Sequence, residues 1–162
     1  MTGHPRRRAA GFTLVELVVT VAIVAVLASI GLPLAELAVK RQREQELRVA
    51  LREIRAAIDA YKLAADQGRI ARSAEQSGYP ASLDVLVRGV EDMRSKEREK
   101  IYFLRQLPRD PTFPDSTVPA AGTWGRRSYA SPPDVPREGS DVYDIYSLAP
   151  GAGLNGVDYR NW

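Results

Sequence analysis

The sequence predicts an α+β protein, in which a long N-terminal α-helix packs through its second half on a head built around a small antiparallel β-sheet. Three observations support this fold class. An apolar run covers residues 12–39, and apolar residues at helical spacing continue to residue 61. Beyond residue 67 the chain carries nine of its 11 prolines and nine of its 12 glycines, which favours short strands and loops. The 162 residues leave room for one domain with an appended segment.

Composition excludes several kinds of functional site. The chain has no cysteine, so disulfides, thiol chemistry and cysteine-ligated metals are excluded. Its single histidine is His4, so a catalytic triad or a zinc site elsewhere in the chain would lack an imidazole. The serine, lysine and carboxylate side chains show no spacing typical of a nucleophile with its base. We therefore predict that the protein is not an enzyme.

The distribution of charge gives no support for nucleic-acid binding, and we expect no nucleic-acid partner. The chain has 23 Lys and Arg against 20 Asp and Glu. Three of the basic residues are the arginines at residues 6–8, and residues 1–11 hold no acid, so residues 12–162 carry 20 charges of each sign. The basic character belongs to an N-terminal tag rather than to a binding face.

The apolar run is long enough to cross a membrane. Residues 12–39 would form a helix of about 42 Å at about 1.5 Å per residue, and a span needs about 20 residues. The only charges in the run are Glu16 and Glu36, and Glu36 lies near its end, where it can reach the interface. Glu16 is embedded among aliphatic residues. A carboxylate costs about 2.5–3.5 kcal/mol at the centre of a membrane helix, and less near its edge.

Three interpretations of this segment are open. An ordinary secretory signal peptide would be cut after residues 26–28, although the apolar run continues past that point. A plain membrane anchor leaves the cost of Glu16 unexplained. In the third interpretation, Glu16 has a charged partner on another chain.

Residues 11–17 (GFTLVEL) resemble the prepilin cleavage and methylation motif of type IV pilins and type II secretion pseudopilins. A short basic leader ends in Gly11, Phe12 follows it, and Glu16 is the fifth residue after the predicted cut. Pro33, the twenty-second residue after the cut, also fits the spacing of the family. The resemblance implies a pilin-like fold and supplies the partner that the third interpretation needs.

The same resemblance assigns roles to these residues. A prepilin peptidase and methyltransferase would cut between Gly11 and Phe12 and methylate the new amino group of Phe12. Residues 12–39 would form the transmembrane and filament-core helix, with the leader, residues 1–11, in the cytoplasm and the head in the periplasm. Glu16 would neutralise the Phe12 amine of a neighbouring subunit. A buried ion pair of this kind fixes register more than it adds stability.

Residues 40–67 are predicted to continue the helix as an amphipathic segment that enters the head. Its apolar residues lie on one face, which we expect to pack on the head rather than bind a ligand: Leu47, Leu51, Ile54, Ile58 and Tyr61. Opposite charges four residues apart form three expected pairs on the other face: Glu44–Arg48, Arg55–Asp59 and Lys62–Asp66. Gly68 is the expected C-cap, and Pro33 should kink the helix or melt it locally.

Residues 68–162 are predicted to form the globular head. Ser82 is the expected N-cap of one short helix, which Gly89 ends. We also expect a solvated charge run at residues 96–100 and a rigid turn at residues 107–111. Short strands are expected at residues 101–104, 126–130 and 142–148.

Short motifs in the head resemble the major, G-type pseudopilin of type II secretion: Tyr79 with Pro80, residues 107–111, Trp124 with Gly125, residues 146–148, and Asn161 with Trp162. That family commonly binds calcium in the loop after the Tyr-Ser-Leu strand. The acid usually found soon after the leucine is missing here, which leaves Asp158 and Asn155 as candidate calcium ligands. The alternative is a glycine-rich loop closed by its own hydrogen bonds, with Trp162 packed under it. We expect no required cofactor, and calcium as an optional one.

The resemblance implies a structural subunit. The protein would be a single-pass protein of the bacterial inner membrane that polymerises with itself and with other pseudopilins on an inner-membrane assembly platform. The resulting periplasmic pseudopilus would drive protein export. Two alternatives stay open. One is a major or minor type IV pilin that serves adhesion, motility or DNA uptake, and the other is a membrane-anchored periplasmic binding module that never polymerises.

Overall fold

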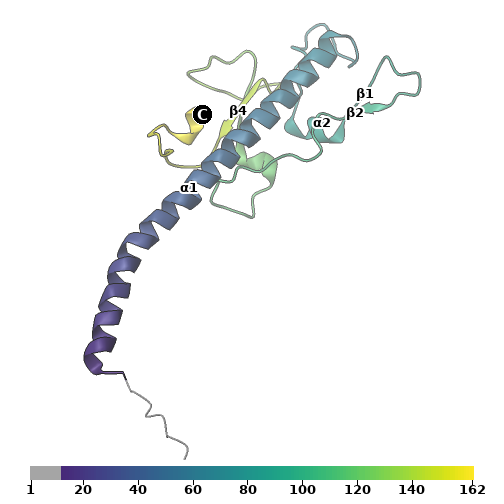
Figure 1. Ribbon diagram of the computed structural model, residues 1–162. Coiled ribbons are helices and arrows are strands. Elements are labelled where there is room, and N and C mark those ends of the chain that lie inside the picture. Colours follow the sequence, from purple (N-terminus) through teal and green to yellow (C-terminus); the bar gives the residue numbers. More distant parts are fainter. Residues whose placement is uncertain (1–11) are drawn as a thin grey trace, which may run out of the picture. The chain divides into compact units, whose positions relative to one another are not determined.

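The computed structural model describes residues 12–162, apart from the side chains of residues 30–32. The predicted leader, residues 1–11, lies outside the described residues, and the predicted cleavage residue Gly11 lies there with it. The chain divides into two compact units, Met1–Lys40 and Arg41–Trp162. One helix, α1 (Leu14–Asp66), contributes to both units (Figure 1).

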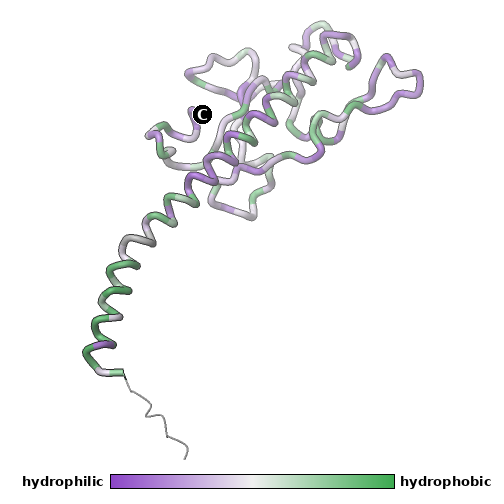
Figure 2. Tube along the Cα trace, viewed as in Figure 1, coloured by the Kyte–Doolittle hydropathy of each residue, from purple (hydrophilic) through white to green (hydrophobic). Residues whose placement is uncertain are grey.

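The first unit contains the apolar half of α1. Thr13 caps this helix, because its hydroxyl oxygen accepts the Glu16 N–H at 3.2 Å and its carbonyl accepts the Leu17 N–H at 3.1 Å. Hydrophobic residues dominate this half (Figure 2), and by length and composition the helix could cross a membrane. The helix continues through Pro33, so the expected local melting does not occur in α1. The expected kink stays a prediction.

The second half of α1 forms the spine of the head. Its predicted apolar face is buried, apart from the half-buried last member of the series: Leu47, Leu51, Ile54, Ile58 and Tyr61. The helix ends as predicted before Gly68, which has a φ of 68°. The Gly68 N–H donates to the Ala65 carbonyl at 3.0 Å, and the Arg69 N–H donates to the Ala64 carbonyl at 2.9 Å. These two bonds form a Schellman motif, which requires the left-handed conformation that glycine adopts readily.

The predicted antiparallel sheet is present as two strand pairs. The larger pair joins β3 (Trp124–Arg127) to β4 (Asp144–Ser147), and β4 lies inside the strand predicted at residues 142–148. The smaller pair joins β1 (Val90–Glu91) to β2 (Lys100–Ile101). Two-residue strands are too short to show an alternating pattern, so the sequence gives no signal for β1.

The strand expected at residues 126–130 lies two residues earlier, as β3. Gly125 permits this shift, because a Cβ at this position would lie 2.2 Å from the ring of Tyr146, the residue opposite it in the ladder. The strand ends when the Ser128 N–H donates instead to the Arg137 carbonyl at 2.9 Å. The position of β3 is therefore set by a contact between strands rather than by local propensity.

The strand expected at residues 101–104 is also shorter than predicted. The N–H groups of Phe103 and Leu104 both donate to the Leu86 carbonyl at 3.0 Å, so the chain turns onto the neighbouring helix instead of extending the ladder. The charge run at residues 96–100 precedes this turn and is exposed, as predicted.

The predicted short helix is present as α2 (Leu83–Arg88), and Gly89 ends it with a φ of 73°. Ser82 holds the N-cap position in an extended conformation, but its hydroxyl forms no capping hydrogen bond. The predicted position is thus correct, and the predicted side-chain cap is wrong. Leu83 and Leu86 are buried and attach α2 to the core of the head.

The core of the head lies between α1 and the β3–β4 pair, with the remaining loops gathered along the helix (Figure 1). Trp124, at 2% exposure, is its largest buried side chain, and the Trp124 Nε1–H donates to the Pro108 carbonyl at 2.8 Å. That bond fixes the predicted turn at residues 107–111 on the core. Two short 3₁₀ helices complete the head: η1 (Ala120–Thr123) and η2 (Tyr159–Asn161).

Candidate assembly site

Glu16 lies in the first turn of α1, where the backbone N–H groups carry a partial positive charge. Thr13 and Glu16 have the spacing of a capping box, and the threonine half of that motif is formed. The helix therefore stabilises a carboxylate in its first turn more than it would stabilise a carboxylate at the centre of the apolar segment. The sequence analysis missed this local role, although the Thr-x-x-Glu spacing signals it.

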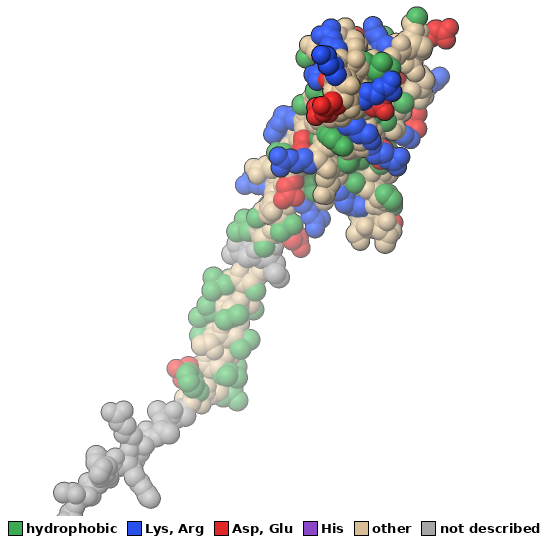
Figure 3. All heavy atoms as spheres, turned by 90° about the vertical axis from the view of Figure 1, so that its right-hand side faces the viewer, with side chains coloured by type: hydrophobic (Ala, Val, Ile, Leu, Met, Phe, Trp, Pro, Cys, Tyr) green, Lys and Arg blue, Asp and Glu red, His purple; other side chains and the backbone are tan. Residues whose placement is uncertain are grey.

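Within the described residues, the apolar half of α1 is left uncovered. Every described side chain of residues 12–39 is exposed, and among the large hydrophobic residues the exposed fraction reaches 80% for Phe12 and 78% for Leu14. Figure 3 shows hydrophobic side chains along this stretch of helix, interrupted by few others. A contiguous apolar surface of this extent marks contact with a membrane or with other proteins.

The hydroxyl groups in this stretch are satisfied inside the helix. Thr20 Oγ1 donates to the Leu17 carbonyl at 2.8 Å, and Ser29 Oγ donates to the Val26 carbonyl at 2.7 Å. Polar side chains bonded back to their own helix need no water, so both are compatible with lipid or protein surroundings. Glu16 is then the polar group whose requirement for a partner is greatest.

The structure places Phe12 and Glu16 at the same end of α1. Among residues 12–162, Glu16 forms no salt bridge. The predicted ion pair joins Glu16 of one chain to the Phe12 amine of another, so a single chain does not test it. Cleavage at Gly11 and methylation of Phe12 likewise stay predictions.

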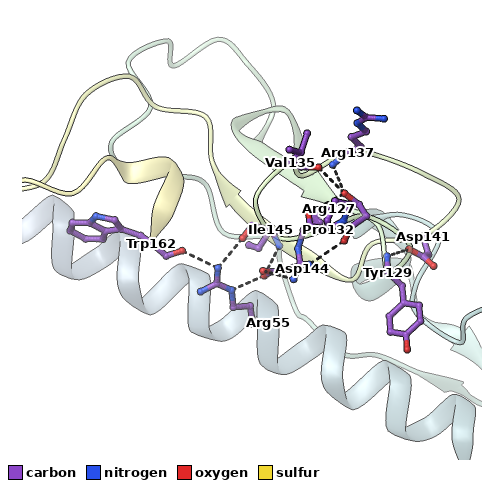
Figure 4. Close-up of polar contacts among 11 residues, drawn as sticks. Arg55, Arg127, Tyr129, Pro132, Val135, Arg137, Asp141, Asp144, Ile145 and Trp162 are labelled. Atoms are coloured by element: carbon purple, nitrogen blue, oxygen red, sulfur yellow. Dashed lines mark hydrogen bonds and ion pairs between the residues drawn. The ribbon is translucent and has the colours of Figure 1, made fainter.

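Two of the three charged pairs predicted on α1 are replaced by contacts with the head, and Arg55 gives the clearest case (Figure 4). Its Nε–H donates to Asp144 Oδ1 at 2.8 Å, and its Nη2–H donates to the carbonyls of Ile145 and Trp162 at 3.0 Å each. In the part of the chain that the structure describes, Arg55 forms no salt bridge with Asp59. The third predicted pair, Lys62–Asp66, is confirmed at 2.6 Å.

Glu44, predicted to pair with Arg48, instead turns into the head and is 6% exposed. Its Oε1 accepts the Leu154 N–H at 2.8 Å and the Tyr159 hydroxyl at 3.2 Å. Burial and the nearby Glu44 carboxylate raise the pKa of the Tyr159 phenol. The Arg48 guanidinium lies 4.5 Å from the centre of the Trp162 ring. The signal for Glu44 was its position on the apolar stripe, three residues before Leu47.

Asp110 is a second buried carboxylate that the sequence analysis missed. It is fully buried within the predicted turn, at 0% exposure. Its Oδ1 accepts the Thr112 N–H at 2.7 Å and the Thr112 hydroxyl at 2.6 Å, and its Oδ2 accepts the Ser147 hydroxyl at 2.5 Å. The local bonds form an Asx turn, which the Asp-Pro-Thr sequence favours. Nothing in the sequence signals the long-range bond to β4.

The candidate calcium ligands do not fit a calcium site. The Oδ1 atom of Asn155 already accepts the Val157 N–H at 3.1 Å, and Asp158 is an exposed residue whose side chain forms no capping bond to η2. Across residues 12–162, no three acidic or histidine side chains come together as a metal-binding group. One free carboxylate is a poor donor set for an ion that takes six to eight oxygens. The loop instead forms its own hydrogen bonds, as the alternative interpretation predicted.

Comparison with known proteins agrees with the sequence motif and the fold. Residues 6–32 match the family described as the prokaryotic N-terminal methylation motif. Over 168 aligned residues the chain is 29% identical to the type II secretion system core protein G of Pseudomonas aeruginosa, and the alignment covers 97% of each chain. No solved structure matches the chain. In the motif at the start of the helix, the similarity along the whole chain and the α+β head, the protein resembles type IV pilin-like proteins of the G-type pseudopilin kind.

Proposed function

We propose that this protein is a structural subunit of a type II secretion pseudopilus. A prepilin peptidase removes residues 1–11 and the amino group of Phe12 is methylated. The apolar half of α1 then anchors the subunit in the bacterial inner membrane, with the head in the periplasm. Subunits polymerise with one another and with other pseudopilins on an inner-membrane platform, and growth of the filament drives protein export. The role is structural rather than catalytic.

One observation carries this proposal: the exposed apolar half of α1 bears a carboxylate, Glu16, in its first turn. A filament buries that surface when the helices of neighbouring subunits replace lipid around it. Packing of these apolar side chains then supplies most of the energy of assembly. The full-length similarity to a type II secretion core protein supports the same function.

The ion pair between chains sets the register of this packing. The helix N-terminus and the cationic amine of Phe12 create positive charge at one end of each subunit, and Glu16 lies within one helical turn of it. Apolar helix surfaces pack in many registers with similar energy, whereas a carboxylate and an amine meet in only one. The pair therefore selects one stagger between neighbours.

The experiment compares Glu16→Gln with Glu36→Gln in cells that contain the assembly machinery. Both substitutions remove one negative charge from the apolar segment and keep the shape of the side chain. Membranes are treated with formaldehyde, and cross-linked multimers are separated by electrophoresis, which also reports leader removal by the shift in mass. We expect multimer ladders for the wild type and E36Q and monomers for E16Q, with the leader removed in all three.

Two results would contradict the proposal. Ladders for E16Q equal to those of the wild type would show that the Glu16 charge has no role in assembly. Monomers for every protein, including the wild type, would indicate a membrane-anchored protein that does not polymerise.

A further inference from the structure

The loop that leads from β4 to η2, residues 149–158, contacts α1 through hydrogen bonds to Glu44. Glu44 is its anchor on the helix, and the Leu154 N–H and the Tyr159 hydroxyl both donate to the same carboxylate oxygen. The carboxylate is buried, so these two donors replace the water that it would otherwise bind.

Trp162 closes the loop from its other end. Its ring packs on Gly153 so tightly that a Cβ at that position would lie 2.2 Å from the ring. Its Nε1–H donates to the Val157 carbonyl at 3.1 Å, and the Arg55 guanidinium binds its carbonyl at 3.0 Å. The ring of Tyr159 packs against the same indole, with a centroid distance of 5.3 Å.

Three carbonyl oxygens of the loop already accept hydrogen bonds from groups of the loop or η2. The Val157 carbonyl also accepts the Gly153 N–H at 2.9 Å. The Gly153 carbonyl accepts the Gly156 N–H at 2.9 Å, and the Gly151 carbonyl accepts the Tyr159 N–H at 3.2 Å. A cation that bound these three oxygens would have to compete with these hydrogen bonds.

The contact between the loop and Glu44 has the opposite polarity to a cation site. A bound cation organises a loop by drawing carbonyl and carboxylate oxygens toward one point. Here an N–H and an O–H converge on one point, and a negative carboxylate occupies it. The loop is therefore built around an anion that α1 supplies.

We propose that Glu44, with Trp162, holds the C-terminal loop in its folded form in place of a metal ion, so that the head is stable without calcium. This inference does not depend on the proposed role in secretion. It concerns the folding of the head and would hold for any pilin-like function.

The test uses the full-length protein purified in detergent. Thermal unfolding, followed by tryptophan fluorescence, is measured in excess calcium chloride and in excess EGTA. We expect the same midpoint in both. A midpoint that falls in EGTA, or that rises in calcium and loses this response in Asp158→Asn, would overturn the proposal.

Hydrogen exchange of the loop peptides tests the role of Glu44 directly. Glu44→Gln keeps the size of the side chain and one acceptor oxygen but removes the charge and replaces the other oxygen by an amide N–H₂ group. We expect exchange in residues 149–158 to become about tenfold faster, because two hydrogen bonds to a charged acceptor are replaced by weaker bonds to a neutral amide. The control is Glu46→Gln, an exposed carboxylate on the same helix whose Oε1 accepts the Gln42 amide at 2.9 Å.

Exchange in E44Q equal to that of the wild type would show that Glu44 does not hold the loop. If E44Q does not fold, Tyr159→Phe removes one of the two donors to Glu44 and leaves the ring packed on Trp162. The same acceleration of exchange, smaller in size, is expected for that variant, and its absence would contradict the proposal.

Discussion

Removal of the Asp110 carboxylate should destabilise the head strongly, because this buried side chain ties its own turn to β4. Asp110 lies in the turn before η1, Thr112 follows it, and Ser147 ends β4. The Asp110 N–H also donates to the Thr123 hydroxyl at 3.2 Å. The carboxylate therefore connects the turn to the larger strand pair at a site that water does not reach.

The magnitude follows from the bonds that each substitution removes. In Asp110→Ala, three bonds to a charged acceptor are lost, and the buried hydroxyl of Ser147 loses its acceptor. Each such bond contributes about 1.5–3 kcal/mol, and bonds to one group are not additive, so we expect a loss of about 3–5 kcal/mol in the free energy of unfolding. Asp110→Asn keeps an acceptor for Thr112 and can donate to Ser147 Oγ, so we expect a loss of only about 1–2 kcal/mol.

Asp115 offers a matched control. It forms the same local turn, since its Oδ1 accepts the Thr117 N–H at 2.9 Å and the Thr117 hydroxyl at 2.7 Å, but it is exposed. We expect Asp115→Ala to lower the free energy of unfolding by much less than Asp110→Ala does. Urea unfolding of the full-length protein in detergent, followed by the fluorescence of buried Trp124, measures all three variants. Equal losses for D110A and D115A would refute the reasoning, because burial and the bond to Ser147 would then contribute nothing.

Two further predictions concern the helix spine and the smaller strand pair. Ile54→Ala, at a fully buried position on α1, should lower the free energy of unfolding by about 2–5 kcal/mol, whereas Leu63→Ala, at 59% exposure on the same helix, should change it by less than about 0.5 kcal/mol in the same urea assay. Equal losses would show that the α1 stripe is not the core. A hydrogen bond from the Arg69 guanidinium, with another from the Arg94 N–H, holds the pKa of Asp92 below its ordinary value. The resulting stabilisation is complete above the pKa of the unfolded chain, about 3.9, and is lost as the pH falls through the lower folded value. Thermal unfolding midpoints measured as the pH falls from neutral through this range should therefore drop less steeply for Asp92→Asn than for the wild type, and parallel curves would contradict this prediction.

Helical periodicity predicted the spine of this fold well, because burial and helix geometry act together there. The apolar stripe from Leu47 to Ile58 is buried, and the helix ends in a Schellman motif at Gly68. Both features depend on residues within a few turns of one another, so they are visible in the sequence. The short strands were placed less well, because the contact of Gly125 with Tyr146 is made between segments far apart in the chain.

The charged pairs on α1 also divide into those that local spacing predicts and those that contacts with distant segments decide. Lys62–Asp66 lies on the solvated face and forms as its spacing predicts. Glu44 and Arg55 have equally favourable local partners but meet loops of the head, where burial makes long-range hydrogen bonds stronger than exposed local pairs. The two buried carboxylates, Glu44 and Asp110, could not be assigned roles from sequence because their partners lie 110 and 37 residues away.

The sequence predicted the assembly site through the motif at residues 11–17. Residues 11–17 indicated the processing site and the role of Glu16, and the comparisons support that motif. The cap formed by Thr13 adds a local reason for an acid in the first turn of α1. The contact of Glu16 with a second chain depends on packing between subunits, which the sequence and structure of one chain do not contain.

The most direct test of the central claim, that residues 11–17 form a prepilin processing site, is the intact mass of the protein extracted from membranes of cells that contain the prepilin peptidase. The account predicts a mature chain that begins at Phe12 and is heavier than its unmodified sequence by one methyl group. A functional protein that keeps residues 1–11, or a mature chain that begins at Ser29, would contradict it.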